Sequence, residues 1–137
     1  MRFMIIVKGD PVIEAGEMPD PEAVNQMGIY HEALHEAGVL VDASGLQPTS
    51  KGFRIRYEGS ERTVVDGPFA ETKELIAGYT IIQVASRDEA LYWARRFPNP
   101  RGEGEACEIE VRQMFELDDF EQGEGVERFR KLGVGGA

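Results

Sequence analysis

The stretch that decides the fold is residues 66–84, DGPFAETKELIAGYTIIQV, in which a turn-forming segment runs into an apolar strand. Pro68 has no backbone N–H to donate to a β-ladder, so a strand that precedes it must end there. Residues 77–84 are rich in β-branched and aromatic side chains and contain no charged residue. This composition predicts a strand in the middle of a sheet.

A hairpin precedes this stretch and a helix follows it. Residues 52–57 alternate between apolar and polar side chains. After a turn, residues 62–65 provide a second strand that runs back along the first. That pattern predicts a β-hairpin with one solvated face. On the other side, Ser86 and Glu89 form a capping box that begins a helix, and Pro98 ends it.

A strand and a long helix precede the hairpin. Residues 2–7 are rich in β-formers, which predicts the first strand. Asp20 as N-cap and Pro21 at the first helical position begin a helix, apolar residues recur along it at three- and four-residue spacing, and Gly38 ends it. We expect at most a short strand at 39–41, with an irregular segment after it as far as residue 48.

With a last strand near residues 106–114, the order is strand, helix, hairpin, strand, helix, strand. This order predicts an α+β fold of the ferredoxin-like βαββαβ type, with both helices on one face of an antiparallel sheet. The other face then has no cover within the chain. An uncovered apolar sheet face invites a partner, most often a second copy, so we expect a homodimer.

The composition is that of one globular domain. A chain of 137 residues buries roughly two-thirds of its unfolded surface, so its core needs no disulfide or structural metal. There are 25 acidic and 15 basic side chains, a net charge of −10. Nucleic-acid phosphates require a basic face, and no Lys or Arg cluster supplies one. We therefore expect no nucleic-acid partner.

Two features predict a cytoplasmic protein without a membrane association. No apolar run approaches the roughly 18 residues of a membrane span, and the apolar stretch before Lys8 is too short for a signal peptide. The single cysteine, Cys107, excludes an internal disulfide and fits a reducing compartment. Its apolar-alternating surroundings favour a buried or half-buried thiol over a nucleophile.

The same central stretch resembles the DGPF branch of the YCII-related proteins. The resemblance covers residues 1–115 and leaves 116–137 as an acidic extension. It implies a ferredoxin-like α+β fold paired into a dimeric α/β-barrel-like assembly, and it implies little about activity. The segments that carry it are 4–7, 37–40, 45–48, 66–74, 77–79 and the helix 88–94.

Relatives in the wider YCII-related family include a dehydrochlorinase of a chlorinated hydroxyquinol, a branch associated with a His–Asp pair. The resemblance places that histidine at Met27 of this chain and that aspartate at Phe97. Both positions are apolar here. The acid–base chemistry of that branch is therefore not expected from these two residues.

The helix contains His31-Glu32-Ala33-Leu34-His35, a literal H-E-x-x-H. In zinc metalloproteases this spacing sets two imidazoles one turn apart, with the Glu beside the metal-bound water. A third ligand would have to be a carboxylate, because the chain has only two histidines. Glu58 and Glu61 stand at a workable distance in sequence, but on the predicted hairpin. We expect no metal and no cofactor.

The candidate catalytic residues are His31 and Asp66, and the candidate ligand-binding residues are Lys73, Tyr79 and Tyr30. Each has a structural alternative. Asp66 precedes Gly-Pro, a sequence typical of a turn in which the aspartate accepts from nearby backbone amides. Lys73 is equally compatible with a solvated connecting loop. The two tyrosines are equally compatible with positions in the hydrophobic core.

These residues predict a small-molecule-binding domain, with a lyase or hydrolase activity on a small organic substrate left open. The alternative is a non-catalytic dimeric module that docks another protein through its exposed sheet or its acidic extension.

Overall fold

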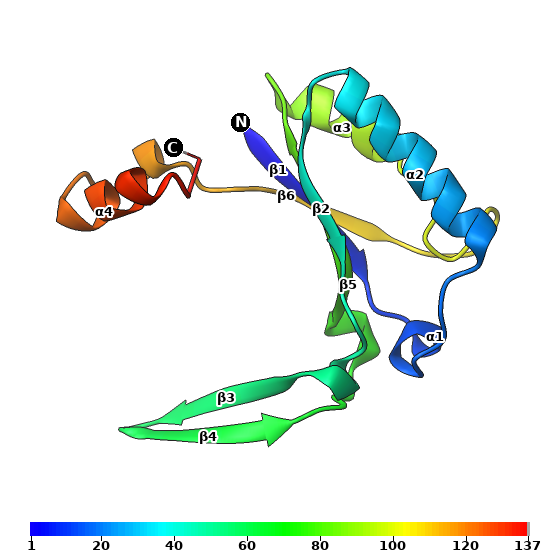
Figure 1. Ribbon diagram of the computed structural model, residues 1–137, viewed down its shortest axis with the longest axis horizontal. Helices are drawn as coiled ribbons and strands as arrows, with labels where there is room; N and C mark the ends of the chain where they lie inside the picture. Colours follow the sequence, from blue (N-terminus) through cyan, green and yellow to red (C-terminus); the bar gives the residue numbers. More distant parts are fainter. Residues whose placement is uncertain (137) are drawn as a thin grey trace.

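The chain folds into two antiparallel sheets and four α-helices in the computed structural model, which describes residues 1–136 (Figure 1). The side chain of Lys73 lies outside the described part. The strands are β1 Arg2–Lys8, β2 Leu40–Gly45, β3 Phe53–Glu58, β4 Glu61–Asp66, β5 Ile76–Gln83 and β6 Ile109–Gln113. The α-helices are α1 Pro11–Glu14, α2 Pro21–Glu36, α3 Arg87–Arg95 and α4 Glu124–Leu132, with 3₁₀ turns η1 Thr49–Lys51, η2 Thr72–Glu74 and η3 Leu117–Asp119.

The main sheet has the order β2-β5-β1-β6, and each of its pairings is antiparallel. Its two inner strands are β1 and β5. Ile5 of β1 lies opposite Thr80 of β5 on one side and Val111 of β6 on the other. The prediction that residues 77–84 form a central strand is confirmed, and so is the broader prediction of an α+β fold with an antiparallel sheet.

The predicted hairpin forms, but it is not part of the main sheet. Strands β3 and β4 pair with each other in a separate two-stranded sheet, and the partner of β5 is β2. Strand β2 runs on to Gly45, through a segment expected to be irregular. Residues 42–45 of this strand are weak β-formers, and the ladder to β5 imposes the extended backbone, with Ala43 opposite Thr80. Gly78 permits this approach, because a Cβ there would lie 3.1 Å from the Ser44 carbonyl oxygen.

Both long helices begin at the predicted caps. The Asp20 carboxylate accepts from the backbone N–H of Glu22, and Pro21 is the first residue of α2. In α3, the Ser86 hydroxyl accepts from the N–H of Glu89, whose carboxylate accepts in turn from the N–H of Ala85. These bonds satisfy N–H groups that have no partner within the helix.

Helices α2 and α3 cover one face of the main sheet (Figure 1). Alternate residues of β1 and β5 point toward them, and Ile5, Leu34 and Ile82 are fully buried there. The polar Thr80 is also buried on this face. The remaining members of the core cluster are Phe3, Tyr30, Val39, Val84 and Ala90.

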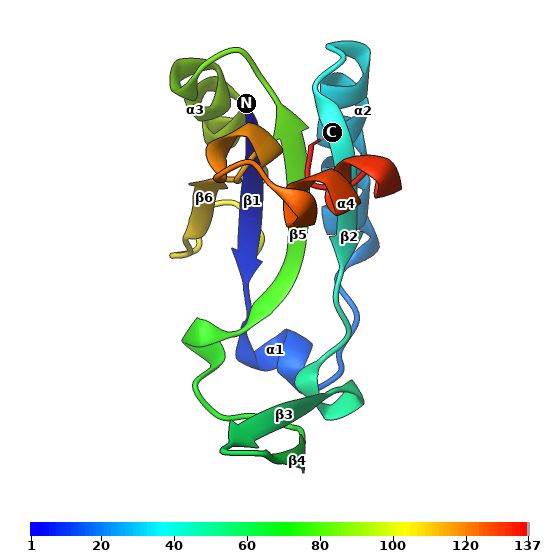
Figure 2. The same cartoon turned by 90° about the vertical axis from the view of Figure 1, so that its left-hand side faces the viewer.

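The opposite face of the sheet lacks such a layer. Met4 lies opposite Ile81 and Ile6 opposite Tyr79 on this side, which we call the open face. The hairpin β3–β4 and the segment that contains α4 both project from the side of the open face, one near each end of the sheet (Figures 1 and 2). Among the described residues, no helix is both long and apolar enough to cross a bilayer.

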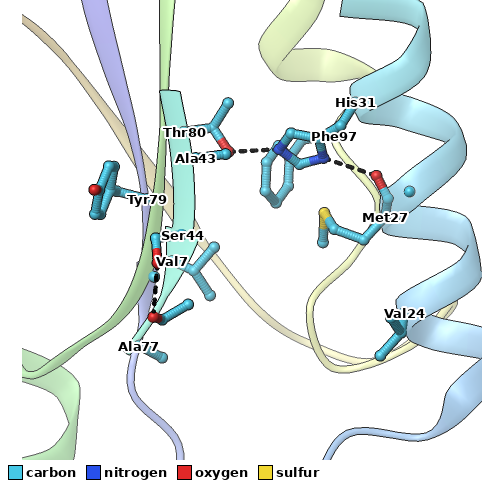
Figure 3. Close-up of a pocket in the computed structure, with 13 residues that line it drawn as sticks. Val7, Val24, Met27, His31, Ala43, Ser44, Ala77, Tyr79, Thr80 and Phe97 are labelled. Atoms are coloured by element: carbon cyan, nitrogen blue, oxygen red, sulfur yellow. Dashed lines mark hydrogen bonds between the residues drawn. The ribbon is translucent and has the colours of Figure 1, made fainter. Parts of the chain in front are cut away.

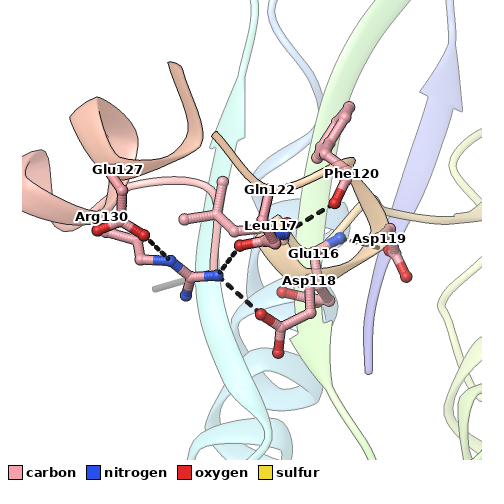
Figure 4. Close-up of polar contacts among 8 residues, drawn as sticks. All are labelled: Glu116, Leu117, Asp118, Asp119, Phe120, Gln122, Glu127 and Arg130. Carbon is pink, nitrogen blue, oxygen red and sulfur yellow. Dashed lines mark hydrogen bonds and ion pairs between the residues drawn. The ribbon is translucent and has the colours of Figure 1, made fainter. Parts of the chain in front are cut away.

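A polar network holds the C-terminal segment, residues 116–136, together (Figure 4). Arg130 donates to Asp118 at 2.8 Å and to Gln122 at 2.8 Å. Arg2 of β1 pairs with Glu116 at 3.1 Å, which ties the start of this segment to the main sheet. Leu117 and Val126 are buried beneath it.

Replacing Leu34 by alanine is expected to lower the free energy of unfolding by about 2–5 kcal/mol, because a fully buried leucine leaves a cavity when it is truncated. Leu91→Ala on α3 is the matched control, since that side chain is exposed. Urea unfolding measures both. A loss at Leu34 no larger than that at Leu91 would contradict the core described above.

Candidate functional site

A cavity of about 390 Å³ lies between α2 and the helix-covered face of the main sheet (Figure 3). Several of its lining residues are exposed, among them Val24, Gly28 and Ala43, so it opens to solvent. The residues that line it are Val7, Val24, Met27, Gly28, His31, Ala43, Ser44, Gly45, Ala77, Gly78, Tyr79, Thr80 and Phe97.

The cavity exists because small residues face each other where α2 crosses the sheet. Gly28 on the helix and Gly78 and Ala43 on the strands have little or no side chain to fill the space. A Cβ placed on Gly28 would meet no atom within 4 Å, so the volume beside the helix is open. Val24 and Met27 border it at helical spacing, and most of the lining is therefore apolar.

His31 lines this cavity and is hydrogen-bonded through both ring nitrogens. Its Nδ1 lies 2.7 Å from the carbonyl oxygen of Met27, and its Nε2 lies 2.8 Å from the Thr80 hydroxyl (Figure 3). A carbonyl oxygen only accepts, so Nδ1 carries the hydrogen in either charge state of the ring. In the neutral ring, Nε2 is then the bare nitrogen, and it accepts from Thr80. In the imidazolium, Nε2 donates to Thr80 instead.

The surroundings hold the imidazole in one orientation. Its ring makes edge contacts with Tyr30 and Phe97, at centroid distances of 5.5 and 6.4 Å. Thr80 is only 2% exposed, and His31 satisfies its hydroxyl. Such a base can take a proton from a ligand or from the Thr80 hydroxyl, and the imidazolium can return it.

The tyrosine candidates occupy different environments. Tyr79 contributes to the cavity wall, but its ring lies across the sheet from His31, where its hydroxyl donates to Asp42 at 3.1 Å (Figure 3). The Asp42 carboxylate raises the pKa of that phenol. Tyr30 belongs to the core and donates to the Trp93 carbonyl at 2.7 Å, and burial raises the pKa of its phenol.

The structure does not bring Asp66 to His31. Asp66 is the exposed last residue of β4, opposite Phe53, on the hairpin that projects away from α2 (Figure 1). It is not among the lining residues. Lys73 lies in η2, and its side chain is outside the described part of the chain.

The DGPF turn instead joins the hairpin to its base. A Cβ on Gly67 would collide with the Thr49 carbonyl, so only glycine fits there. The backbone N–H of Phe69 donates to the Thr49 hydroxyl at 3.0 Å, and that hydroxyl donates to Glu14 at 2.6 Å. Gly67 and Phe69 therefore have a structural role, which is to hold the hairpin against the turn that contains Thr49.

The two histidines of the H-E-x-x-H motif do not act together. Both ring nitrogens of His31 already have partners, and His35 is exposed one turn further along α2. Over the described residues, no group of three or more His, Cys, Asp or Glu side chains is placed to hold a metal.

Thr80, Met27, Gly28 and Phe97 are site residues that sequence reasoning did not select. One signal was available for Thr80, because period-two alternation sets it on the same face as Gly78 and Ile82. A single hydroxyl on an otherwise apolar, helix-covered strand face needs a partner. Met27 and Phe97 both line the cavity.

The fold and this site define an α+β domain with one histidine turned into a mostly apolar cavity under its long helix. The family model of the YCII-related domain matches residues 1–115. The chain belongs to the YCII-related family.

One curated relative is an uncharacterized protein of Rhizobium meliloti (strain 1021), 39% identical over 80 residues, which are 58% of this chain. The match spans 64% of the length of that relative.

A solved structure is similar at a TM-score of 0.47 and 15% identity, covering 85% of this chain and 95% of the other. It is 5-chloro-2-hydroxyhydroquinone dehydrochlorinase from Burkholderia phenoliruptrix AC1100, in complex with 2,5-dihydroxybenzoquinone. A similarity of that size assigns no ligand and no reaction to this chain.

The neutral ring of His31 is expected to carry its hydrogen on Nδ1, because the Met27 carbonyl accepts there. Nitrogen-15 chemical shifts of the two imidazoles at alkaline pH measure this. His35 is the internal control, since its exposed ring has no such constraint. A neutral His31 with the hydrogen on Nε2 would contradict the bonding described.

Above pH 10, the free energy of unfolding is expected to fall partly because of Tyr30. Burial raises the pKa of this phenol in the folded state. The contribution of the neutral phenol to the free energy of unfolding is therefore complete below its ordinary pKa of 10.0, and it is lost as pH rises from there toward the raised pKa of the folded state. Tyr30→Phe should flatten this decline. Denaturant unfolding across the alkaline range measures it, with exposed Tyr92→Phe as control; equal slopes for the two variants would refute the assignment.

Proposed function

We propose that the protein binds a small, largely apolar organic molecule in the cavity under α2 and that His31 exchanges a proton with it. The observation that carries this proposal is the orientation of His31, whose Nδ1 is engaged by the Met27 carbonyl while Nε2 bonds the Thr80 hydroxyl, all three residues lining the cavity. The cavity, at about 390 Å³, lies in the size range of small-molecule pockets. Its mostly apolar lining with few polar groups is also typical of such pockets.

The chemistry that suits this site is removal of a proton from the ligand. The neutral Nε2 accepts the proton and the electron pair stays on the ligand, which then expels a leaving group or holds the charge on a carbonyl oxygen. Thr80 gives up its bond to the neutral ring and accepts one from the imidazolium. A lyase-type elimination needs a positioned base of this kind, so we favour it over hydrolysis.

Two variants test the site against a panel of small neutral aromatic and aliphatic fragments. In His31→Gln, fragment affinity is expected to fall about tenfold or more, because the buried polar contact is lost. In Gly28→Leu, the new side chain is expected to fill the cavity and abolish binding, while the helix tolerates leucine better than glycine. NMR titration measures both, through the signals of Thr80 and Phe97.

His35→Gln is the matched control, since it removes the other imidazole one turn away on the exposed surface. It should bind fragments as the unchanged protein does. Fragments that perturb only the open face, or that bind His31→Gln and Gly28→Leu with full affinity, would overturn the proposed site.

We also propose that the core is a ferredoxin-like βαββαβ unit, residues 1–115, and that a second copy covers its open face. The strand order β2-β5-β1-β6, with a helix after β1 and after β5, supports the first part. Met4, Tyr79 and Ile81 support the second, since they are apolar or aromatic side chains that are only half-buried on the side away from the long helices.

A second candidate function is docking of another protein without catalysis. The exposed hairpin and the acidic extension favour it, because each presents side chains that the chain itself does not cover. A monomeric protein whose cavity takes no fragment would make this function the leading one. A dimer that binds fragments under α2 would set it aside.

A further inference from the structure

The hydrogen bond between His31 and Thr80 spans the cavity from α2 to the sheet. Both residues line the cavity, and the side chains of Val7, Val24 and Met27 all lie on one side of this bond (Figure 3). A molecule that fills the cavity therefore lies against the bond. Because Nδ1 of His31 is engaged by the Met27 carbonyl, the polar group that a ligand meets is the pair formed by Nε2 and the Thr80 Oγ1.

The other polar side chains of the lining lie elsewhere. Ser44 is opposite Tyr79 in the ladder of β2 with β5, and the Tyr79 ring points away from His31 across the sheet (Figure 3). Among the side chains that the structure describes, no Asp, Glu, Lys or Arg lines the cavity. A charge buried without a partner costs free energy, so the cavity favours a neutral ligand while His31 is neutral.

The ionisable groups that face His31 are two phenols. Tyr30 contacts its ring, and Tyr79 belongs to the cavity wall. Burial raises the pKa of Tyr30, and a hydrogen bond to a carboxylate raises the pKa of Tyr79, so both stay neutral while an imidazole titrates. On α2 itself, Glu32 and His35 are exposed, and β1, β2 and the loop after α3 add no ionisable side chain to the lining. His31 is therefore the group whose ionisation changes the charge within the described lining.

The Thr80 hydroxyl reverses its direction when His31 ionises. While the ring is neutral, Thr80 donates its hydrogen to Nε2, and Oγ1 offers the cavity only lone pairs. In the imidazolium, Nε2 donates to Oγ1 and the hydroxyl hydrogen is released. Thr80 is only 2% exposed, and its one side-chain bond within the described residues is the bond to His31. The released hydrogen consequently needs an acceptor, which a ligand in the cavity can supply.

We propose that this pair selects the ligand by its hydrogen-bonding group and that one proton reverses the selection. With neutral His31 the pair presents an acceptor, Oγ1, and selects a ligand that donates. With protonated His31 it presents the Thr80 hydroxyl as donor and selects a ligand that accepts. This inference rests on the proposed function, and it adds Thr80 as the residue that contacts the polar group of the ligand.

The selection defines a ligand class. A proton exchange between ligand and His31 takes the site through both states, so the polar group of the ligand has to serve in both. A hydroxyl group does so, because it donates to Oγ1 in the first state and accepts from Thr80 in the second. A neutral compound with a hydroxyl group is therefore the ligand class of this cavity.

Three probes of similar size test the selection on the full chain. Pyrrole only donates, cyclopentanone only accepts, and cyclopentanol does both, and all three stay uncharged while an imidazole titrates. NMR titrations measure their dissociation constants above and below the ionisation of His31, which the imidazole signals report in the same samples. The ratio of the pyrrole constant to the cyclopentanone constant is expected to rise about tenfold on protonation, because one buried hydrogen bond is gained and another lost. Cyclopentanol should change least.

Variants assign the effect to the two residues. Thr80→Val keeps the branched shape but removes the hydroxyl, so the ratio should no longer depend on pH. Thr80→Ser keeps the hydroxyl and should retain the tenfold rise. In His31→Gln nothing in the pair ionises, so the ratio should be constant, whereas the control His35→Gln should behave as the unchanged protein does. Circular dichroism verifies folding. If Thr80→Val does not fold, a rise lost in Thr80→Ser or retained in His31→Gln still overturns the proposal.

The outcomes separate the selection from the proposed function. If neither the fragment panel nor these probes perturb Thr80 and Phe97, the proposed function is wrong and the selection with it. If the panel binds under α2 but the ratio ignores the ionisation of His31, the selection alone is overturned. A tenfold rise that persists in Thr80→Val would show that ligands meet Nε2 directly, which would overturn the role of Thr80.

Discussion

The alternation of side chains along β5 is the constraint on which the rest of the structure depends. This strand is hydrogen-bonded to β1 on one side and to β2 on the other, so its backbone is fixed in register along both edges. Gly78, Thr80 and Ile82 consequently face the helices, and Tyr79 and Ile81 face away. A shift of one residue would exchange the two sets and bury a tyrosine hydroxyl that now bonds Asp42.

The cavity follows from that alternation. Ile82 packs under α2 as core, whereas Gly78 further along the same face leaves space against Gly28. Thr80 stands between them, and a hydroxyl in such a place costs free energy unless it is bonded. His31 supplies the bond, so one contact both satisfies the buried hydroxyl and orients the imidazole. The stability of this region and the proposed chemistry therefore depend on the same pair of side chains.

The hairpin β3–β4 and the C-terminal segment both project from the side of the main sheet opposite the long helices (Figures 1 and 2). The hairpin is anchored only at its base, where Gly67 and Phe69 meet Thr49 and where Thr49 bonds Glu14. The C-terminal segment is anchored at its start by Arg2 and Glu116. Both anchors are polar and specific, while the surfaces beyond them are apolar and exposed. A surface that is held in place at its base and exposes aromatic side chains is suited to binding another protein surface.

The sequence by itself determined what local periodicity and capping encode: the strand at 77–84, both long helices with their caps, the hairpin, and the motifs that indicate the YCII-related family. Only the tertiary structure decided that β2 continues through the weak β-formers 42–45, that it pairs with β5, and that the hairpin stands apart. It also decided that His31 meets Thr80 and that Asp66 lies on the projecting hairpin. The reason is physical, because caps and alternation act within a few residues, whereas strand pairing and the bond between residues 49 positions apart depend on which surfaces the whole chain brings together.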